Sequence, residues 1–186
     1  MTFSRALLAV VVAAVSLVLR GRQPDTTANR IPFEAKFRAI CGDRWLDRAA
    51  QIKAESNFDP NARSFDGGEG LGQATGIWPE YIRRGWVPND STPFQVGPAI
   101  MGANAYMISL ETQLGSWRAG YCGYNAGARS IQKAQRLAKL AKYPAPMTDG
   151  FLQALPEVTG KASRWTINYD RNIRAIRADY RRKGLG

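Results

Sequence analysis

The sequence predicts a mainly α-helical protein, with a glycine-rich loop or a small β element between its helices. Beyond residue 33, apolar side chains recur at three- and four-residue steps, the period of helices that bury one face. We find no convincing run of alternating apolar and polar residues, the pattern of a half-buried strand. With 186 residues and 45 % hydrophobic side chains, the chain has room for one domain with a core and a short appendage.

The appendage is predicted at the N-terminus, over residues 1–22. Residues 6–19, ALLAVVVAAVSLVL, are a long uncharged apolar run. As a helix this run would be about 21 Å long, shorter than the ~30 Å hydrocarbon core of a bilayer, which fits a signal peptide better than a membrane span. The small-x-small pattern at 14–16 is a poor cleavage site, so we favour an uncleaved signal-anchor over a cleaved signal. Either segment predicts a protein of the cell envelope or periplasm, anchored to the inner membrane or exported.

Residues 23–35 are predicted to be a tether, because Pro, Asn and Thr interrupt them and they show no apolar period. The globular domain is then expected over residues 36–186. The predicted helices, in order, cover residues 34–56, 76–84, 99–114, 116–141 and 166–183. The glycine-rich loop 64–72 lies between the first two helices, and prolines near both ends of residues 86–98 predict a loop between the next two.

Composition narrows the possible functions. The net charge is +11, with a pI near 10.1, which favours a polyanionic partner such as nucleic acid, an anionic membrane or an acidic cell-wall polymer. The chain has no His, so neither a His-dependent catalytic triad nor a His metal site is possible, and we expect no metal or cofactor. Cys41 and Cys122 allow at most one internal disulfide, and a small buried side chain explains each equally well.

Glu55 is the candidate catalytic residue. Trp45 and Ile52 recur on one helical face, and Glu55 lies at the edge of that face, just before Asp59-Pro60 forces the chain out of the helix. A carboxyl group partly removed from water in such a place would have a raised pKa and would hold a proton near neutrality. From this stretch alone, a solvated glutamate on the last helical turn is the more economical interpretation.

Residues 55–73, ESNFDPNARSFDGGEGLGQ, favour a catalytic Glu55 over a solvated one. They contain a Glu-Ser dipeptide, an aromatic residue, Asp-Pro, a serine nine residues after the glutamate, and then Gly-Leu-x-Gln. This stretch resembles the signature of soluble lytic transglycosylases (the SLT family), a goose-type-lysozyme-like group that cleaves the glycan of peptidoglycan. The family's Tyr-Asn-Ala-Gly motif matches residues 124–127, and a tyrosine that opens its last helix matches Tyr169. The resemblance spans roughly residues 40–182 and implies a single lysozyme-like domain.

The resemblance also implies a role for each matching residue. Glu55 takes the part of general acid and base, because cleavage of a glycosidic bond requires a proton on the leaving oxygen. Ser64, Gln73 and Tyr124 match positions that line the substrate cleft, and their neutral polar groups suit sugar hydroxyl and N-acetyl groups. Asn125 is a further candidate for substrate binding, although capping of a helix end explains this residue at least as well.

Two departures from the family pattern affect the predicted site. Ala74 and Thr75 stand where an apolar residue and methionine usually follow the glutamine, which predicts a less apolar floor of the cleft. Tyr169 lies twelve residues after Glu157, whereas the family tyrosine closely follows a Glu-Thr pair. Trp165 is therefore an alternative to Tyr169 for that wall of the groove.

The predicted function is a peptidoglycan lytic transglycosylase. The enzyme would cleave the MurNAc–GlcNAc β-1,4 bond of glycan strands and leave a 1,6-anhydro-MurNAc end. Small members of the family open the wall locally, in phage particles or beside envelope-spanning secretion machines, so virion or secretion-machine proteins are possible partners.

Three alternatives stay open at this level. A lysozyme-type hydrolase would need a second carboxylate, for which Asp66 and Glu69 are candidates. A non-enzymatic wall-binding or virion component would keep the fold and lose catalysis. A basic nucleic-acid-binding protein would use a stripe of cations on the last helix, Arg171, Arg174, Arg177 and Arg181. The apolar N-terminal segment and the saccharide-related motif argue against a specific nucleic-acid partner.

Overall fold

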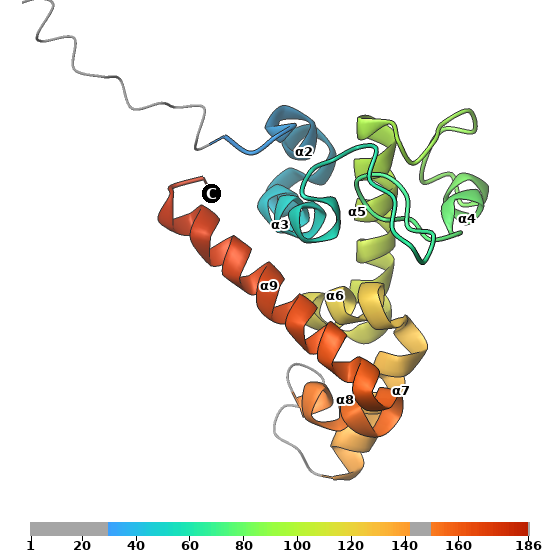
Figure 1. Cartoon of the computed structure of the whole chain (residues 1–186), viewed down its shortest axis with the longest axis vertical. Coiled ribbons are helices and arrows are strands. Elements are labelled where there is room, and N and C mark those ends of the chain that lie inside the picture. The colour runs from blue at the N-terminus through green and yellow to red at the C-terminus, as the bar shows by residue number, and fades with distance from the viewer. Residues whose placement is uncertain (1–29, 142–149, 186) are drawn as a thin grey trace, which may run out of the picture. The chain divides into compact units, whose positions relative to one another are not determined.

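The computed structural model describes residues 30–141 and 150–185 (Figure 1). The chain divides into two units, Met1–Arg30 and Ile31–Gly186. The expected apolar segment 1–22 and most of the expected tether 23–35 lie outside the described residues. Within the described ranges, no helix has the length and apolar character needed to cross a membrane.

The second unit is built from helices, which confirms the predicted mainly α class. In chain order these are α2 (Glu34–Cys41), α3 (Trp45–Ser56), α4 (Trp78–Arg83), α5 (Val96–Leu114), α6 (Trp117–Ala126), α7 (Ala128–Leu140), α8 (Phe151–Thr159) and α9 (Ser163–Arg182). Single turns of 3₁₀ helix precede α3 (Gly42–Arg44) and α9 (Gly160–Ala162). Among the described residues, β pairing is limited to one isolated antiparallel bridge between Arg63 and Glu69, in the glycine-rich loop.

Glycines divide two of the predicted helices. The expected helix 34–56 is broken at Gly42, which has φ 52° and ends α2. The expected helix 116–141 is broken at Gly127, which has φ 79° and separates α6 from α7. Both values lie in the left-handed region that favours glycine, so the chain can turn there without the cost of a Cβ clash. The apolar period continues across both breaks, which is why it predicted unbroken helices.

Helix α8 was not predicted at all. Pro156 lies inside this nine-residue helix, and proline normally ends a helix because it lacks an N–H donor. The helix nevertheless buries Phe151, Ala154 and Leu155 against the rest of the core. Burial of these three side chains therefore outweighs the local cost of the proline.

One hydrophobic core contains side chains from α2, α3 and each of the helices α5, α6, α7, α8 and α9. Its fully buried side chains include Phe37, Ile52, Met107 and Leu110. A second, smaller cluster consists of Ala74, Trp78, Tyr81 and Val87, from α4 and the loops on either side of it. Figure 1 shows α4 beside the upper part of α5, away from the long diagonal α9. The glycine-rich segment before α4 is thereby held against α5.

Ion pairs fix α9 to the neighbouring helices. Asp170 is almost completely buried, and the guanidinium of Arg118 on α6 contacts both of its carboxylate oxygens, at 2.9 and 2.8 Å. Arg177, further along α9, lies 2.5 Å from an Asp47 oxygen on α3. Tyr169 precedes Asp170 directly, so the Arg118–Asp170 pair helps to hold the part of α9 that carries Tyr169.

The two cysteines are both free thiols, and both are buried. Of the two interpretations left open by the sequence, a disulfide and a small buried side chain, the structure has the second. Burial raises the pKa of the Cys41 thiol to about 11 and that of the Cys122 thiol to about 12, so neither is a thiolate near neutrality.

We expect Asp170→Ala to lower the free energy of unfolding by about 3 kcal/mol, because it removes the buried carboxylate that Nε and Nη2 of Arg118 contact. Urea denaturation at neutral pH measures this change. Asp179→Ala is the matched control, since Asp179 pairs with Arg182 and Lys183 on the solvent side of the same helix. We expect no measurable change in that control, and equal effects of the two variants would contradict the prediction.

Candidate functional site

The side chain of Glu55 lies on the last turn of α3, beside a cavity of about 300 Å³. The helix stops after Ser56 because Asn57 and Phe58 both have positive φ, 52° and 65°, and the N–H of Asn57 closes the helix on the carbonyl of Lys53 at 3.0 Å. Two successive non-glycine residues in the left-handed region are uncommon. They turn the chain sharply, so Glu55 faces the glycine-rich loop that follows.

The Glu55 carboxyl group is held in a protonatable state by its surroundings. Burial raises its pKa to about 7, and the nearby Asp66 carboxylate acts in the same direction. A hydrogen bond donated by the Tyr169 hydroxyl to Oε1 acts in the opposite direction, because it stabilises the carboxylate. The structure therefore places Tyr169 of α9 on Glu55. The alternative, Trp165, is 63 % exposed and lies under the guanidinium of Arg164 instead.

Ser64 organises the tip of the glycine-rich loop. Its hydroxyl donates to the Asp66 carboxylate and accepts from the Gly68 N–H at 2.8 Å, while its own N–H bonds to the Gly68 carbonyl at 2.9 Å. The loop is tightly packed, since a Cβ at Gly70 would lie only 1.8 Å from the Pro93 carbonyl oxygen. Glycine is thus required there for close approach of two backbone segments, rather than for flexibility.

Gln73 closes the loop on itself and also lines the Glu55 cavity. The residue has φ 49°, and its Nε2 donates to the carbonyl of Gly70 at 2.9 Å. A second contact of Nε2, with the carbonyl of Ala62, measures 3.4 Å. The sequence predicted an amide that faces the sugar, whereas the structure shows its NH₂ group engaged with the loop backbone.

Tyr124 and Asn125 reach the cavity from the C-terminal end of α6. The Tyr124 hydroxyl donates to the carbonyl of Gly72 at 2.6 Å, so this phenol holds the loop rather than Glu55. Asn125 is exposed, and its Oδ1 accepts a hydrogen bond of 2.8 Å from Thr166 on α9. The interpretation of Asn125 as a cap of its own helix is therefore replaced by a link between two helices.

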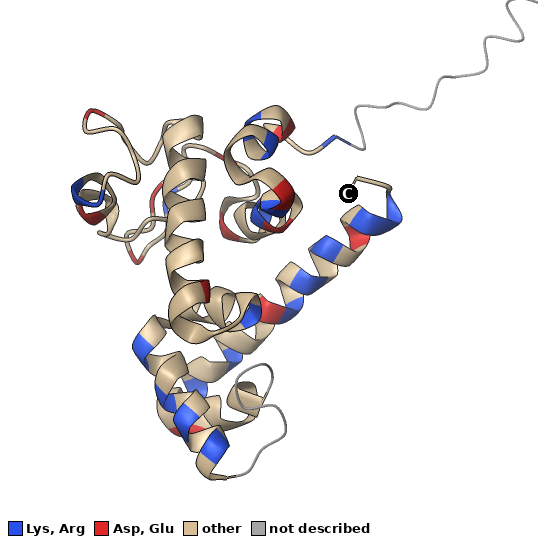
Figure 2. Cartoon of the chain, turned by 180° about the vertical axis from the view of Figure 1, so that it is seen from behind, with Lys and Arg blue, Asp and Glu red and all other residues tan. Residues whose placement is uncertain are grey.

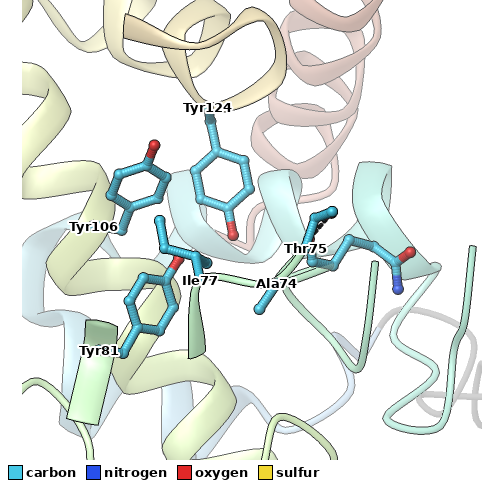
Figure 3. Close-up of a pocket in the computed structure, with 7 residues that line it drawn as sticks. Ala74, Thr75, Ile77, Tyr81, Tyr106 and Tyr124 are labelled. Atoms are coloured by element: carbon cyan, nitrogen blue, oxygen red, sulfur yellow. Dashed lines mark hydrogen bonds between the residues drawn. The ribbon is translucent and has the colours of Figure 1, made fainter. Parts of the chain in front are cut away.

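A second cavity of about 110 Å³ adjoins the first (Figure 3). Gln73, Thr75 and Tyr124 line both cavities, so the two lie next to each other, and together they are called the groove here. Tyr81 from α4 and Tyr106 from α5 complete the second part, where their rings lie 5.8 Å apart. Ala74, which is buried, and Thr75, which is exposed, line this second cavity beside Ile77.

Sequence reasoning missed several residues of this groove. Tyr81 and Tyr106 lie outside the family motifs that were matched, and their three-dimensional convergence gives no local signal in the sequence. Phe65 lies at the mouth of the Glu55 cavity with a fully exposed ring, which is unusual for phenylalanine. Asp66 lines the same cavity, whereas Glu69 lies outside it and pairs with Arg63 at 2.5 Å. In residues 30–141 and 150–185, no cluster of His, Cys, Asp or Glu could hold a metal ion.

The chain matches one protein-family model. Glu55 is half-buried on the last turn of α3, where it faces the glycine-rich loop and lies beside cavities lined by tyrosines. The family model described as "Transglycosylase SLT domain" matches residues 49–144, more than half of the chain, and the chain therefore belongs to this family of peptidoglycan-acting lytic transglycosylases. The match includes Glu55, Ser64, Gln73 and Tyr124, and Tyr169 lies beyond it. A search of curated proteins found no match.

We expect Tyr169→Phe to raise the pKa of Glu55 above about 7, because the variant loses the donor that stabilises the carboxylate. The side-chain carboxyl resonance of Glu55, assigned by its absence in Glu55→Gln, reports this pKa in an NMR titration. Tyr124→Phe is the control, since its hydroxyl bonds to Gly72 instead. An unchanged or lower pKa in Tyr169→Phe would contradict the geometry described here.

Proposed function

We propose that Glu55 is the catalytic acid and base of a lytic transglycosylase that cleaves the MurNAc–GlcNAc β-1,4 bond and leaves a 1,6-anhydro-MurNAc end. The observation that carries this proposal is a mostly buried carboxyl group with a pKa of about 7 in the groove of an SLT-family domain. Near neutrality such a group is populated in both protonation states. One residue can therefore donate a proton and later accept one.

The reaction needs no water and no second carboxylate. Protonated Glu55 transfers its proton to the glycosidic oxygen as the bond from that oxygen to C1 of MurNAc breaks. The resulting carboxylate then takes the proton of the C6 hydroxyl group, and the C6 oxygen forms the new bond to C1. Tyr169 stabilises the carboxylate between these two steps through its hydrogen bond to Oε1. Glu55 ends the cycle protonated.

The walls of the groove suit a glycan strand. Asn125 and Ser64 place neutral polar groups beside Glu55, and these are suited to sugar hydroxyl and N-acetyl groups. The exposed ring of Phe65 offers an apolar face at the mouth. The Gln73 carbonyl oxygen is the part of that side chain left for substrate, because its NH₂ group bonds to the loop backbone.

A lysozyme-type hydrolase is the second candidate, and Asp66 is the observation that favours it. This carboxylate lines the same cavity as Glu55 and raises the pKa of Glu55. A hydrolase needs such a second carboxylate, either as the nucleophile or to activate water. Glu69 is less suited to this role, since Arg63 neutralises it outside the cavity.

We expect Glu55→Gln to lower turnover on purified sacculi by at least ~10²-fold while binding to sacculi is kept, because the amide has no transferable proton. Release of soluble fragments measures turnover, and a pull-down measures binding. Glu69→Gln is the matched control, since it removes a carboxylate of the same loop region outside the Glu55 cavity. A Glu55→Gln variant that keeps more than about a tenth of wild-type turnover would place the acid elsewhere.

The reaction type is decided by mass spectrometry of the fragments released from sacculi. We expect 1,6-anhydro-muramoyl ends, which weigh one water less than reducing ends, and we expect Asp66→Asn to keep the same product. That variant should also lower the pKa of Glu55, because one nearby negative charge is removed. Reducing muramic acid as the main product, together with loss of activity in Asp66→Asn, would instead establish the hydrolase.

The biological setting is a local opening of the cell wall, during phage entry or beside a secretion machine. The apolar run at residues 6–19 supports a location at the inner membrane, with the enzyme in the periplasm or envelope, or in the virion if the protein comes from a phage. Fractionation of cells that express the full chain, compared with a chain lacking residues 1–22, tests this location. Recovery of both chains in the soluble fraction would argue against an anchor.

A further inference from the structure

Positive charge is concentrated in the C-terminal half of the described chain. Residues 116–141 and 150–185 contain 13 Lys and Arg and 3 Asp and Glu, a net charge of +10. Residues 30–115, which supply Glu55 and the glycine-rich loop, contain 9 Lys and Arg and 10 Asp and Glu, a net charge of −1. Figure 2 shows the contrast, with Lys and Arg repeated along α7 and α9.

Half of the six cations of α9 are engaged in ion pairs. Arg174 contacts Asp170 at 3.2 Å, and Arg177 contacts Asp47 at 2.5 Å while its guanidinium lies over the ring of Trp117. At the end of the helix, Arg182 and Lys183 share Asp179. The stripe that the sequence suggested for phosphate binding, Arg171, Arg174, Arg177 and Arg181, is therefore not a row of four free charges.

The free row lies on α7 instead. Arg129, Lys133, Arg136 and Lys139 are all exposed, and within the described ranges none has an ion-pair or hydrogen-bond partner. The opposite face of the helix is buried in the core through Ile131, Ala134 and Ala138. The four charges follow one side of the helix over about 15 Å. The row begins four residues after Asn125, which lines the groove of Glu55.

A depression between α7 and α8 lies beside this row. Its volume is about 460 Å³, and its lining is Lys133, Arg136, Leu137, Leu140, Glu157 and Val158. Leu140 is 79 % exposed, which leaves apolar surface for a ligand to cover. Glu157 would repel a uniformly anionic surface such as DNA or an anionic membrane, but it would attract an amino group. The lining therefore suits a short peptide that carries carboxylates, small apolar side chains and an amine.

We propose that Arg129, Lys133, Arg136 and Lys139, with the depression beside them, form a docking surface for the acidic peptides attached to the glycan strands of peptidoglycan. The proposal rests on the proposed function, since it assigns a second contact to the same polymer. A strand whose sugars lie in the groove is held by its peptides on α7. The tethered polymer then reaches the groove at a raised effective concentration, and the effect weakens with salt.

The test compares two variants with the same change in net charge. One replaces Arg129, Lys133, Arg136 and Lys139 by Gln, and the control replaces Lys36, Arg38, Arg83 and Arg84 by Gln. We expect the α7 variant to bind purified sacculi about tenfold more weakly at low salt, with a smaller dependence on NaCl concentration, and the control to stay within about twofold of wild type. Equal losses in both variants would mean that only net charge matters and would overturn the proposal.

Folding and cleavage are checked separately. The four α7 side chains are exposed, so the thermal midpoint of unfolding of the α7 variant should match that of wild type. If it does not, two pair variants are compared, Arg129→Gln/Lys133→Gln and Arg136→Gln/Lys139→Gln. Each pair variant should lose part of the binding to sacculi. Peptide-free glycan strands should be cleaved equally by wild type and the α7 variant, since the groove is unchanged. Failure of the wild type to cleave them would refute the proposed function, whereas the binding assay alone decides this inference.

The source of the anionic groups is decided by removing the peptides. Sacculi treated with an amidase should bind wild type no better than the α7 variant. Undiminished binding of wild type to treated sacculi would overturn the peptide as ligand. Binding of duplex DNA and of phosphatidylglycerol vesicles is measured in the same way. If the α7 variant lost more binding to either of these than to intact sacculi, the peptide would also be overturned as the ligand.

Discussion

The site depends on one constraint, namely that the Glu55 carboxyl group is removed from water and receives its hydrogen bond from a different helix. Glu55 lies on the last turn of α3, and the hydroxyl that reaches it belongs to α9, 114 residues further along the chain. Burial raises the pKa of the carboxyl group, and the hydrogen bond from the Tyr169 hydroxyl limits that rise. The balance depends on the position of α9, which core packing and the buried Arg118–Asp170 pair next to Tyr169 help to hold. Contacts that hold α9 in place therefore also support the hydrogen bond that Glu55 receives.

The backbone around the groove is held in conformations that ordinary residues avoid. Asn57, Phe58 and Gln73 all have positive φ, and all three lie in the segment between α3 and α4. Left-handed geometry in non-glycine residues costs free energy, so it persists only where surrounding contacts require it. Here Phe58 packs edge-on against Phe37 of the core, and the Gln73 amide bonds to the loop it closes. These contacts keep the loop in place opposite Glu55.

The sequence predicted the helical class and the local part of the site, because both are recorded in short-range spacing. Glu55, Ser64 and Gln73 lie within one stretch of nineteen residues, and the folded loop brings all three to one cavity. Features that depend on tertiary contacts were not predictable in the same way. The apolar period continues across Gly42 and Gly127, so the helix breaks were missed, and α8 was missed because Pro156 obscured it. The choice between Tyr169 and Trp165 required the packing of α9 against α3, which no local pattern shows.

The segregation of charge reconciles a strongly basic protein with a protonated catalytic acid. Cations close to Glu55 would stabilise its carboxylate and lower its pKa, which would remove the proton that glycoside cleavage needs. Among the described residues, no Lys or Arg side chain lines the Glu55 cavity, and the other carboxylate there, Asp66, raises the pKa of Glu55. The free row of cations lies on α7, and screening by salt limits the influence of such exposed charges to about 10 Å. An acidic polymer can therefore be attracted by one part of the fold and cleaved in another, without the attraction reducing the acidity of the catalytic group.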